Sequence, residues 1–520
     1  MKIKYGNILI LSLSLILIGL IVYYFAEKDS FVIYKRNSFI NCQEDSRVYY
    51  EISVREFSDS NGDGIGDING IINNLDYLEN LGIGAINLLP IQESYSSHGY
   101  DIIDYKKIKK EYGTMEDFEN LIKEANRRDI KVNISLVLNN TSDKHIWFEE
   151  AKNGNNKYRD YYIWKRSQDD VDKINHNIIA PSTKFAWREL NEHKHYYALL
   201  SPCIPDLNLS SEFVKNEIKD IAKFYIDKGV DGFKLESVKL YFNSYKENVE
   251  FIENLTSYCK GLRSDFTIIG DVREGESNMK GYLEILDGFL FLNLGDIIKE
   301  GLLEKNINSL SKKLSNYYYQ LNKYSNNNFA IYPILNNKFE DRFINSLGIS
   351  EENMKMAATI YLTLPGNPII YFGEELGVSG KGFVKSKNEA SLIEFINYDS
   401  DKASKIYNNI NENILLSNLE KNKSIYEFYK KLLKARNENI SLKEGTVHYQ
   451  NSGKESVMIM RRKMKDEISY VIINSNKNSV KVNLPAGEYK VTLSNKRESE
   501  IENIKKNLYI DGEEILILTK

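Results

Sequence analysis

The sequence predicts an α/β protein built on a closed parallel (β/α)8 barrel, followed by an antiparallel β-sandwich. Eight short apolar, β-branched segments lie between residues 48 and 375, and amphipathic helical patterns separate them. Nearly continuous apolar strands are typical of a parallel sheet covered on both faces, and eight strand–helix units favour closure into a barrel. An open doubly wound sheet is the alternative.

The predicted strands share a short length and a high content of β-branched and aromatic residues, and they occupy residues 48–54, 83–90, 131–139, 231–237, 266–272, 288–294, 329–337 and 368–375. Helices are predicted between them because apolar residues recur at intervals of three and four, for example in 68–82 and 114–129. The barrel domain is therefore expected to cover residues 46–440.

Two further units are predicted beyond the plain barrel. Residues 140–205, between the third strand and the helix before the fourth, are too many for an ordinary loop, so we expect a small subdomain over the top of the barrel. From 443 to 520, runs such as SVMIMRRKM and ISYVIINS predict strands of the antiparallel β-sandwich domain.

The overall composition excludes several classes of protein. The chain has 520 residues, with 69 basic and 73 acidic side chains spread along it, so no basic surface for nucleic acid is indicated. Cys42, Cys203 and Cys259 show no CxxC spacing and are odd in number, so neither a disulfide framework nor a zinc site is expected.

The first thirty residues differ in kind from the rest of the chain. Lys2 and Lys4 precede an uncharged run, 8–25, which is long enough to cross the hydrocarbon core of a bilayer as a helix. The two lysines predict a cytoplasmic N-terminus, so residues 1–30 are expected to be a single-pass anchor and 31–45 a linker, with the barrel outside the cell membrane. Secretion after signal cleavage is the alternative, but no small-residue cleavage site follows the run.

The segment DSNGDGIGD has the ligand spacing of a loop that binds a hard cation. Asp59, Asn61, Asp63 and Asp67 offer side-chain oxygens, and Ile65 can offer its backbone carbonyl. We therefore expect a structural Ca²⁺ site here, with a plain Gly/Asp-rich turn as the alternative.

Motifs along the barrel carry a family resemblance. They include FSDSNGDGIGDINGI, LDYLENLGIGAINLLPI, DKGVDGFKL and LPGNPIIYFGEELG. Together they resemble the α-amylase family, glycoside hydrolase family 13, in the branch of the oligo-1,6-glucosidases and other α-glucosidases. The resemblance implies a barrel with an inserted B domain, a C-terminal β-domain, a calcium loop and a retaining mechanism on α-glucosidic bonds.

That mechanism uses two carboxyl groups about 5 Å apart, at the C-terminal ends of barrel strands. By resemblance, Glu236 stands at the nucleophile position, where the family has Asp, and Asp271 at the acid/base position, where it has Glu. Lys234 replaces an arginine that binds the nucleophile, and Lys338 replaces a histidine. Phe339 stands in place of the third carboxylate, so the catalytic set is expected to be degenerate.

The other substrate-binding positions that the resemblance implies are strand-end or loop residues: Tyr100, Asp101, Asn140, Asp206, Lys234 and Lys338. Ser135 and Leu240 stand where the family has further polar residues. Glu236 and Asp271 are interpreted as inert remnants or ligand contacts, with a weakened catalytic pair as the alternative. Lys338 either contacts ligand or forms an ion pair with one of these acids and fills the former sugar site.

We therefore expect a membrane-anchored, extracytoplasmic pseudo-glycosidase that acts by binding a carbohydrate such as an α-glucan, or a membrane or envelope protein. The alternative is an active or weakly active α-glucosidase or transglycosidase. A purely structural spacer is a third hypothesis, and it differs in predicting no ligand-dependent change in stability.

Overall fold

The computed structural model describes residues 46–165, 186–191, 194–272, 279–324, 330–346, 350–379 and 423–520. The predicted membrane anchor at 1–30 and the linker at 31–45 lie outside these ranges. Among the helices that the structure describes, none combines the length and the apolar character needed to traverse a bilayer.

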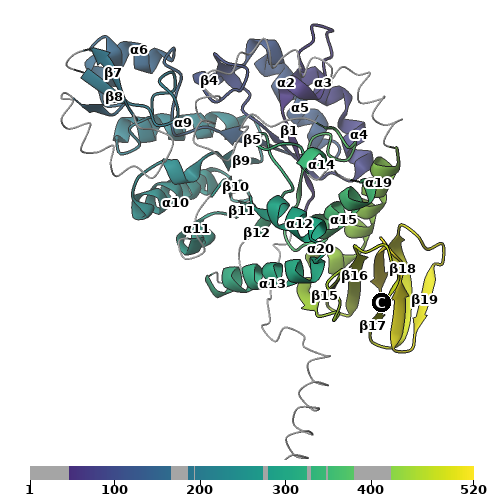
Figure 1. Ribbon diagram of the computed structural model, residues 1–520. Coiled ribbons are helices and arrows are strands. Elements are labelled where there is room, and N and C mark those ends of the chain that lie inside the picture. The colour runs from purple at the N-terminus through teal and green to yellow at the C-terminus, as the bar shows by residue number, and fades with distance from the viewer. Residues whose placement is uncertain are drawn as a thin grey trace, which may run out of the picture.

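Eight parallel strands form the central sheet, in the spatial order β12-β11-β10-β9-β5-β2-β1-β13 (Figure 1). Their bounds are β1 Tyr49–Ile52, β2 Ala85–Leu88, β5 Lys131–Leu136, β9 Gly232–Leu235, β10 Thr267–Gly270, β11 Gly288–Phe291, β12 Ala330–Pro333 and β13 Ile369–Tyr371. The backbone N–H of Asn367, just before β13, donates to the carbonyl oxygen of Ile331 in β12 at 2.8 Å. Each strand lies within its predicted segment, and the (β/α)8 barrel is confirmed.

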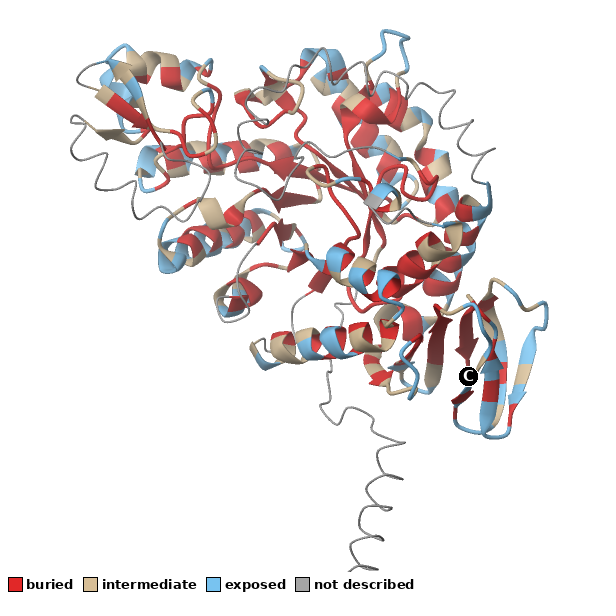
Figure 2. Cartoon of the chain, in the orientation of Figure 1, coloured by how far each residue is buried: buried red, intermediate tan, exposed pale blue. Residues whose placement is uncertain are grey.

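Helices cover the outside of the barrel, with buried faces inward and exposed faces outward (Figure 2). Those on the barrel are α2 Val54–Phe57, α3 Ile68–Asn73, α4 Leu75–Leu81, α5 Met115–Asn126, α9 Glu212–Asp227, α10 Tyr245–Leu262, α11 Met279–Ile285, α12 Leu294–Leu303, α13 Ile307–Tyr324, α14 Phe343–Ser346, α15 Glu351–Leu362 and α19 Lys423–Glu438, with the 3-10 helices η1 Lys110–Tyr112 and η2 Val238–Leu240. In α5, Thr114 and Asp117 form a capping box, and Phe118, Leu121 and Ala125 make the buried stripe.

Two excursions from the barrel lie near the carboxyl ends of its strands. A hairpin of β3 Gln92–Ser94 and β4 Ile102–Ile108 follows β2. Between β5 and α9 the described elements are α6 Ile146–Lys152, α7 Asn156–Arg159, β6 Trp164–Lys165, β7 Trp187–Asn191 and β8 Lys194–Tyr197, with the three strands in one antiparallel sheet. These elements occupy the upper left of Figure 1, away from the C-terminal domain.

The C-terminal domain is antiparallel, as predicted, and follows the short helix α20 Ile440–Glu444. Its strands are β14 Thr446–Gln450, β15 Val457–Met464, β16 Glu467–Asn474, β17 Val480–Asn483, β18 Gly487–Ser494, β19 Ile501–Ile504, β20 Asn507–Ile510 and β21 Ile515–Thr519. A six-stranded sheet, β14-β15-β16-β21-β18-β19, and the pair β17-β20 enclose a second apolar core that includes Val457, Ile472, Val482 and Leu508. The six-stranded sheet packs on α13 and α20 below the barrel (Figure 1).

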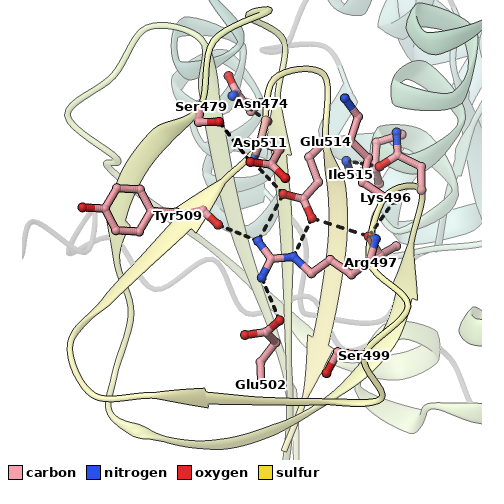
Figure 3. Close-up of polar contacts among 12 residues, drawn as sticks. Asn474, Ser479, Lys496, Arg497, Ser499, Glu502, Tyr509, Asp511, Glu514 and Ile515 are labelled. Carbon is pink, nitrogen blue, oxygen red and sulfur yellow. Dashed lines mark hydrogen bonds and ion pairs between the residues drawn. The ribbon is translucent and has the colours of Figure 1, made fainter.

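A partly buried ion-pair cluster ties the turns of the C-terminal domain together (Figure 3). The guanidinium of Arg497 donates to both carboxylate oxygens of Glu514, at 2.6 and 3.1 Å, and to Glu502 at 2.7 Å. The same guanidinium reaches the carbonyl oxygen of Tyr509 at 2.5 Å. Glu514 is fully buried and has Arg497 as a bidentate partner, so we assign the cluster a structural role.

Two adjacent buried glutamates follow β13 and are held by tyrosines. Glu374 accepts hydrogen bonds from the hydroxyls of Tyr361, at 2.6 Å, and Tyr429, at 2.9 Å. Burial raises the pKa of Glu374 to about 7, although both tyrosine hydroxyls oppose the shift, and the neighbouring Glu375 adds to it. The folded protein therefore keeps a proton on Glu374 at pH values where the unfolded chain has released it.

This proton predicts a specific pH dependence of stability. Between about pH 4.5 and 7, Glu374 holds its proton in the folded state more than in the unfolded state, so this residue makes the free energy of unfolding fall as pH rises, by about 3 kcal/mol. Glu374→Gln mimics the protonated acid and is expected to remove this part of the decline, making the variant more stable than the parent at pH 8. Urea unfolding at pH 4.5, 6 and 8 measures it, with the exposed Glu253→Gln as control. An equal decline in all three proteins would contradict the prediction.

Candidate active site

The carboxyl ends of β9 and β10 bring the two predicted catalytic acids to neighbouring places. Glu236 follows β9 directly and Asp271 follows β10 directly, and both side chains are buried. The backbone N–H of Asp271 donates to the carbonyl oxygen of Leu235 at 2.9 Å, so the two strand ends are hydrogen-bonded to each other. This edge of the barrel is where the sequence predicted the site.

The carboxylate of Glu236 is held by a buried group of polar and charged side chains. Its Oε1 accepts a hydrogen bond from Ser135 Oγ at 2.7 Å and lies 3.1 Å from Lys234 Nζ. The same ammonium lies 2.5 Å from Oε2 of Glu51, in β1. None of these four residues exposes more than 5 % of its surface. Lys234 therefore lies between two acids, Glu51 and Glu236.

The electrostatics of this group keep the lysine charged. Burial alone would lower the pKa of Lys234, but the carboxylates of Glu236 and Glu51 outweigh it, and the pKa lies well above its ordinary value. Burial raises the pKa of Glu51, and the ammonium of Lys234 limits that rise. The ammonium therefore remains available to both carboxylates at neutral pH.

Aromatic rings also lie near the site. The ring of Phe339 lies 5.5 Å from that of Tyr100, centroid to centroid, and Lys338 Nζ lies 5.9 Å from the centroid of Tyr100. Lys338 also donates to the carbonyl oxygen of His98 at 3.2 Å. Burial lowers the pKa of Lys338, and the nearby Glu56 and Glu236 oppose the shift. The ring of Phe339, which by resemblance corresponds to the third carboxylate, therefore lies beside Tyr100.

Three of the predicted substrate-binding residues hold the loops around the site. Asp101 accepts hydrogen bonds from the backbone N–H and the hydroxyl of Ser96, the latter at 2.6 Å. Asn140 donates to the carbonyl oxygen of Tyr100 at 2.9 Å. Asp206 accepts from the backbone N–H of Leu199 at 2.6 Å, and burial raises its pKa to about 7. The structure gives these side chains partners within the protein, and their contact with a sugar stays a prediction.

The DSNGDGIGD loop is closed by its own backbone. Oδ1 of Asp59 accepts from Gly62 N at 2.7 Å, Asn61 Oδ1 from Asp63 N at 2.9 Å, and Asp63 Oδ1 from Ile65 N at 2.8 Å. Asp67 caps α3 through the N–H of Gly70. Over the part of the chain that the structure describes, no group of three or more His, Cys, Asp or Glu side chains gathers closely enough to hold a metal ion. The donor chemistry still fits Ca²⁺, because Asp59, Asn61 and Asp63 offer the oxygens that this hard cation prefers.

Comparison with known proteins agrees with the fold and its motifs. Residues 51–445 match the model of the alpha amylase catalytic domain. The chain is 36 % identical over 440 residues to Alpha-amylase 3 of Dictyoglomus thermophilum, covering 83 % of this chain and 85 % of that protein. It is 32 % identical over 394 residues to an oligo-1,6-glucosidase of Bacillus cereus, covering 68 % of this chain and 69 % of the relative.

A solved structure extends the comparison to the C-terminal domain. The crystal structure of alpha-amylase from H. orenii superposes with a TM-score of 0.79 at 30 % identity, covering 92 % of this chain and all of that one. Sequence and structure therefore agree over both domains, and this chain belongs to the α-amylase family, glycoside hydrolase family 13.

Proposed function

We propose that this chain binds α-glucosides at the carboxyl edge of its barrel and that hydrolysis there is strongly impaired. The observation that carries the proposal is Phe339, which by resemblance corresponds to the third carboxylate and whose ring lies 5.5 Å from that of Tyr100. Hydrogen bonds to the sugar that strengthen in the transition state contribute several kcal/mol in glycosidases, and a phenyl ring supplies none of them. Apolar contact and hydrogen bonding to a ground-state sugar do not need that carboxylate.

The changed lengths of the two acids point the same way. Glu236 is one methylene longer than the family's aspartate and Asp271 one methylene shorter than its glutamate. A displacement of about 1 Å of a catalytic group can lower a rate by about 10²-fold. The two carboxylates can therefore still bind a sugar, but their changed lengths disfavour attack on the anomeric carbon by Glu236 and protonation of the leaving oxygen by Asp271.

A working retaining α-glucosidase or transglycosidase is the second candidate, and the comparisons favour it. Relatives that share about a third of the sequence are named as an α-amylase and an oligo-1,6-glucosidase. Glu236 also keeps a cation and a hydroxyl donor beside it: Lys234 Nζ lies 3.1 Å from its Oε1, and Ser135 Oγ donates to the same oxygen at 2.7 Å.

Binding is tested by calorimetric titration of the purified protein with maltose, isomaltose and longer maltooligosaccharides. Binding of at least one of them is expected, and Tyr100→Ala is expected to weaken it because this ring borders the site. The exposed Tyr509→Ala, on the C-terminal domain, is the matched control. The absence of binding to every sugar would reject the proposal in favour of a protein partner or a spacer.

We further propose that residues 1–30 anchor the barrel outside the cell membrane, where its partners are α-glucans or envelope proteins. The uncharged run at 8–25 supports this proposal. Protease treatment of intact cells tests it, because an outward-facing barrel is expected to be degraded while cytoplasmic proteins survive. Recovery of the barrel in the culture medium would instead support cleavage of the segment.

Calcium is proposed as a structural ligand of the DSNGDGIGD loop, held by Asp59, Asn61, Asp63 and Asp67 and by the carbonyl of Ile65. When bound, it would neutralise the carboxylates and stabilise the turn before α3. Ca²⁺ at about 100 times its Kd is expected to stabilise the fold by about 2.7 kcal/mol.

Thermal unfolding in Ca²⁺ against a chelator measures this stabilisation. Asp59→Ala is expected to abolish the difference, whereas the exposed Asp466→Ala, in the C-terminal domain, should keep it. The same melting temperature with and without Ca²⁺ in the parent protein would show that the loop is a plain turn.

A further inference from the structure

One acidic residue near the site belongs to none of the motifs of the sequence. Glu51 lies in β1, the first barrel strand, and exposes 5 % of its surface. Its Oε2 is 2.5 Å from Lys234 Nζ, which is shorter than the 3.1 Å between that nitrogen and Glu236 Oε1. The ammonium therefore lies closer to Glu51 than to the acid at the nucleophile position.

The barrel explains why these side chains meet. Glu51, Ser135 and Lys234 come from β1, β5 and β9, and all three strands run parallel in one sheet. Ser135 and Lys234 are register partners across β5 and β9, so their side chains leave the sheet at the same level. The long stem of Lys234 then crosses to β1, while Ser135 Oγ binds the same oxygen of Glu236 that faces the ammonium. Side chains from two strands, β5 and β9, thus contact Oε1 of Glu236.

We infer that Glu51 is a positioning residue of the site: it holds the ammonium of Lys234, and through that ammonium it sets the place and the charge state of the Glu236 carboxylate. The inference deepens the proposed function, since it concerns the same site. It requires only that Glu236 keeps these neighbours, and its test needs neither a bound sugar nor turnover. A lysine shared by two buried carboxylates favours the ionised form of each less than a lysine held by one.

Other charged and titratable groups also face Glu236 and stay the same in the test. These groups are Lys338, Tyr100 and Tyr241, and Asp271 interacts with the same two tyrosines. Glu51 contacts Lys234, the cation beside Glu236, at 2.5 Å. Removing the Glu51 carboxylate therefore favours the ionised form of Glu236 in two ways. One negative charge disappears, and the ammonium of Lys234 then pairs with Glu236 alone.

The test compares Glu51→Gln with Ser135→Ala. The protein is labelled with δ-¹³C glutamate, the Glu236 carboxyl resonance is assigned as the one lost in Glu236→Gln, and its chemical shift is followed from pH 4 to 8. Glu51→Gln is expected to lower the titration midpoint of Glu236 by about one pH unit or more, the size expected from a charge within about 4–6 Å. Ser135→Ala removes a hydrogen bond to the ionised form and is expected to raise the midpoint.

Opposite shifts in the two variants distinguish positioning from a merely structural role, which would lower the unfolding temperature and leave both midpoints in place. Glu51→Asp keeps the charge and is expected to return the midpoint towards the parent value, and it serves also if Glu51→Gln folds poorly. A midpoint that is unchanged or raised in Glu51→Gln would overturn the inference. Failure of sugar binding would leave this result intact, so the two proposals fail separately.

Discussion

Restoring three side chains together, Glu236→Asp, Asp271→Glu and Phe339→Asp, is expected to raise the rate of α-glucoside hydrolysis by about 10²-fold or more over the parent. The triple change gives both acids the side-chain lengths that the family has at these positions. It also replaces the apolar ring beside Tyr100 with a carboxylate that can accept hydrogen bonds. The gain is expected to exceed the product of the single changes, because groups that act together in one transition state are not additive. The measurement is kcat/KM for p-nitrophenyl α-glucoside.

The matched control for this experiment is the same double change combined with Phe339→Asn. Asparagine has the size of aspartate but no charge, so a gain that needs the third carboxylate is expected to be largely absent. If the triple variant binds sugar and still shows no gain, changes around the site beyond these three residues limit the reaction, and the account of Phe339 as the main obstacle is wrong.

Replacing Lys234 with methionine is expected to destabilise the barrel by about 3–5 kcal/mol at pH 7, because it leaves buried carboxylates without their cation. Two acids depend on this one ammonium, Glu51 at 2.5 Å and Glu236 at 3.1 Å. The difference in free energy of unfolding between the variant and the parent is expected to become smaller as the pH falls towards 5. The pKa of Glu51 is raised in the folded state by burial, so protonation removes one of the uncompensated charges as the pH falls.

Urea unfolding at pH 5, 6 and 7 measures both the loss and its pH dependence. Lys234→Arg, which keeps a positive charge at this place, is the control and is expected to cost less than the methionine variant at every pH. A methionine variant as stable as the parent at pH 7 would show that the ion-pair group contributes nothing net to the fold.

The barrel could be predicted from the sequence because each strand is marked by local composition. The segments around β1, β9 and β13 are short, apolar and bounded by turn residues, and the structure places a strand in each. In the C-terminal domain the runs SVMIMRRKM and ISYVIINS correspond to β15 and β16. Strands β19 and β20 carry a weaker local signal, since each has only four residues and lies at a sheet edge or in a two-stranded sheet.

Fewer features of the site than of the fold could be predicted from the sequence. Glu236 and Asp271 could be placed because they follow recognisable strands, but Glu51 could not, although a glutamate inside the apolar segment VYYEISV was a visible signal. Its partner Lys234 lies 183 residues further along the chain, and their contact depends on how β1 and β9 face each other inside the closed barrel. The contacts of Lys338 with His98 and Tyr100 were hidden for the same reason.

Steady-state hydrolysis of maltose and isomaltose by the purified protein, at sugar concentrations that saturate the site in calorimetry, tests most directly whether hydrolysis is impaired. We expect a saturated site with a turnover at least about 10²-fold below that of the restored triple variant under the same conditions. Sustained turnover by the parent protein at a rate equal to that of the triple variant, and lost in Glu236→Gln, would contradict it and establish the chain as a working α-glucosidase.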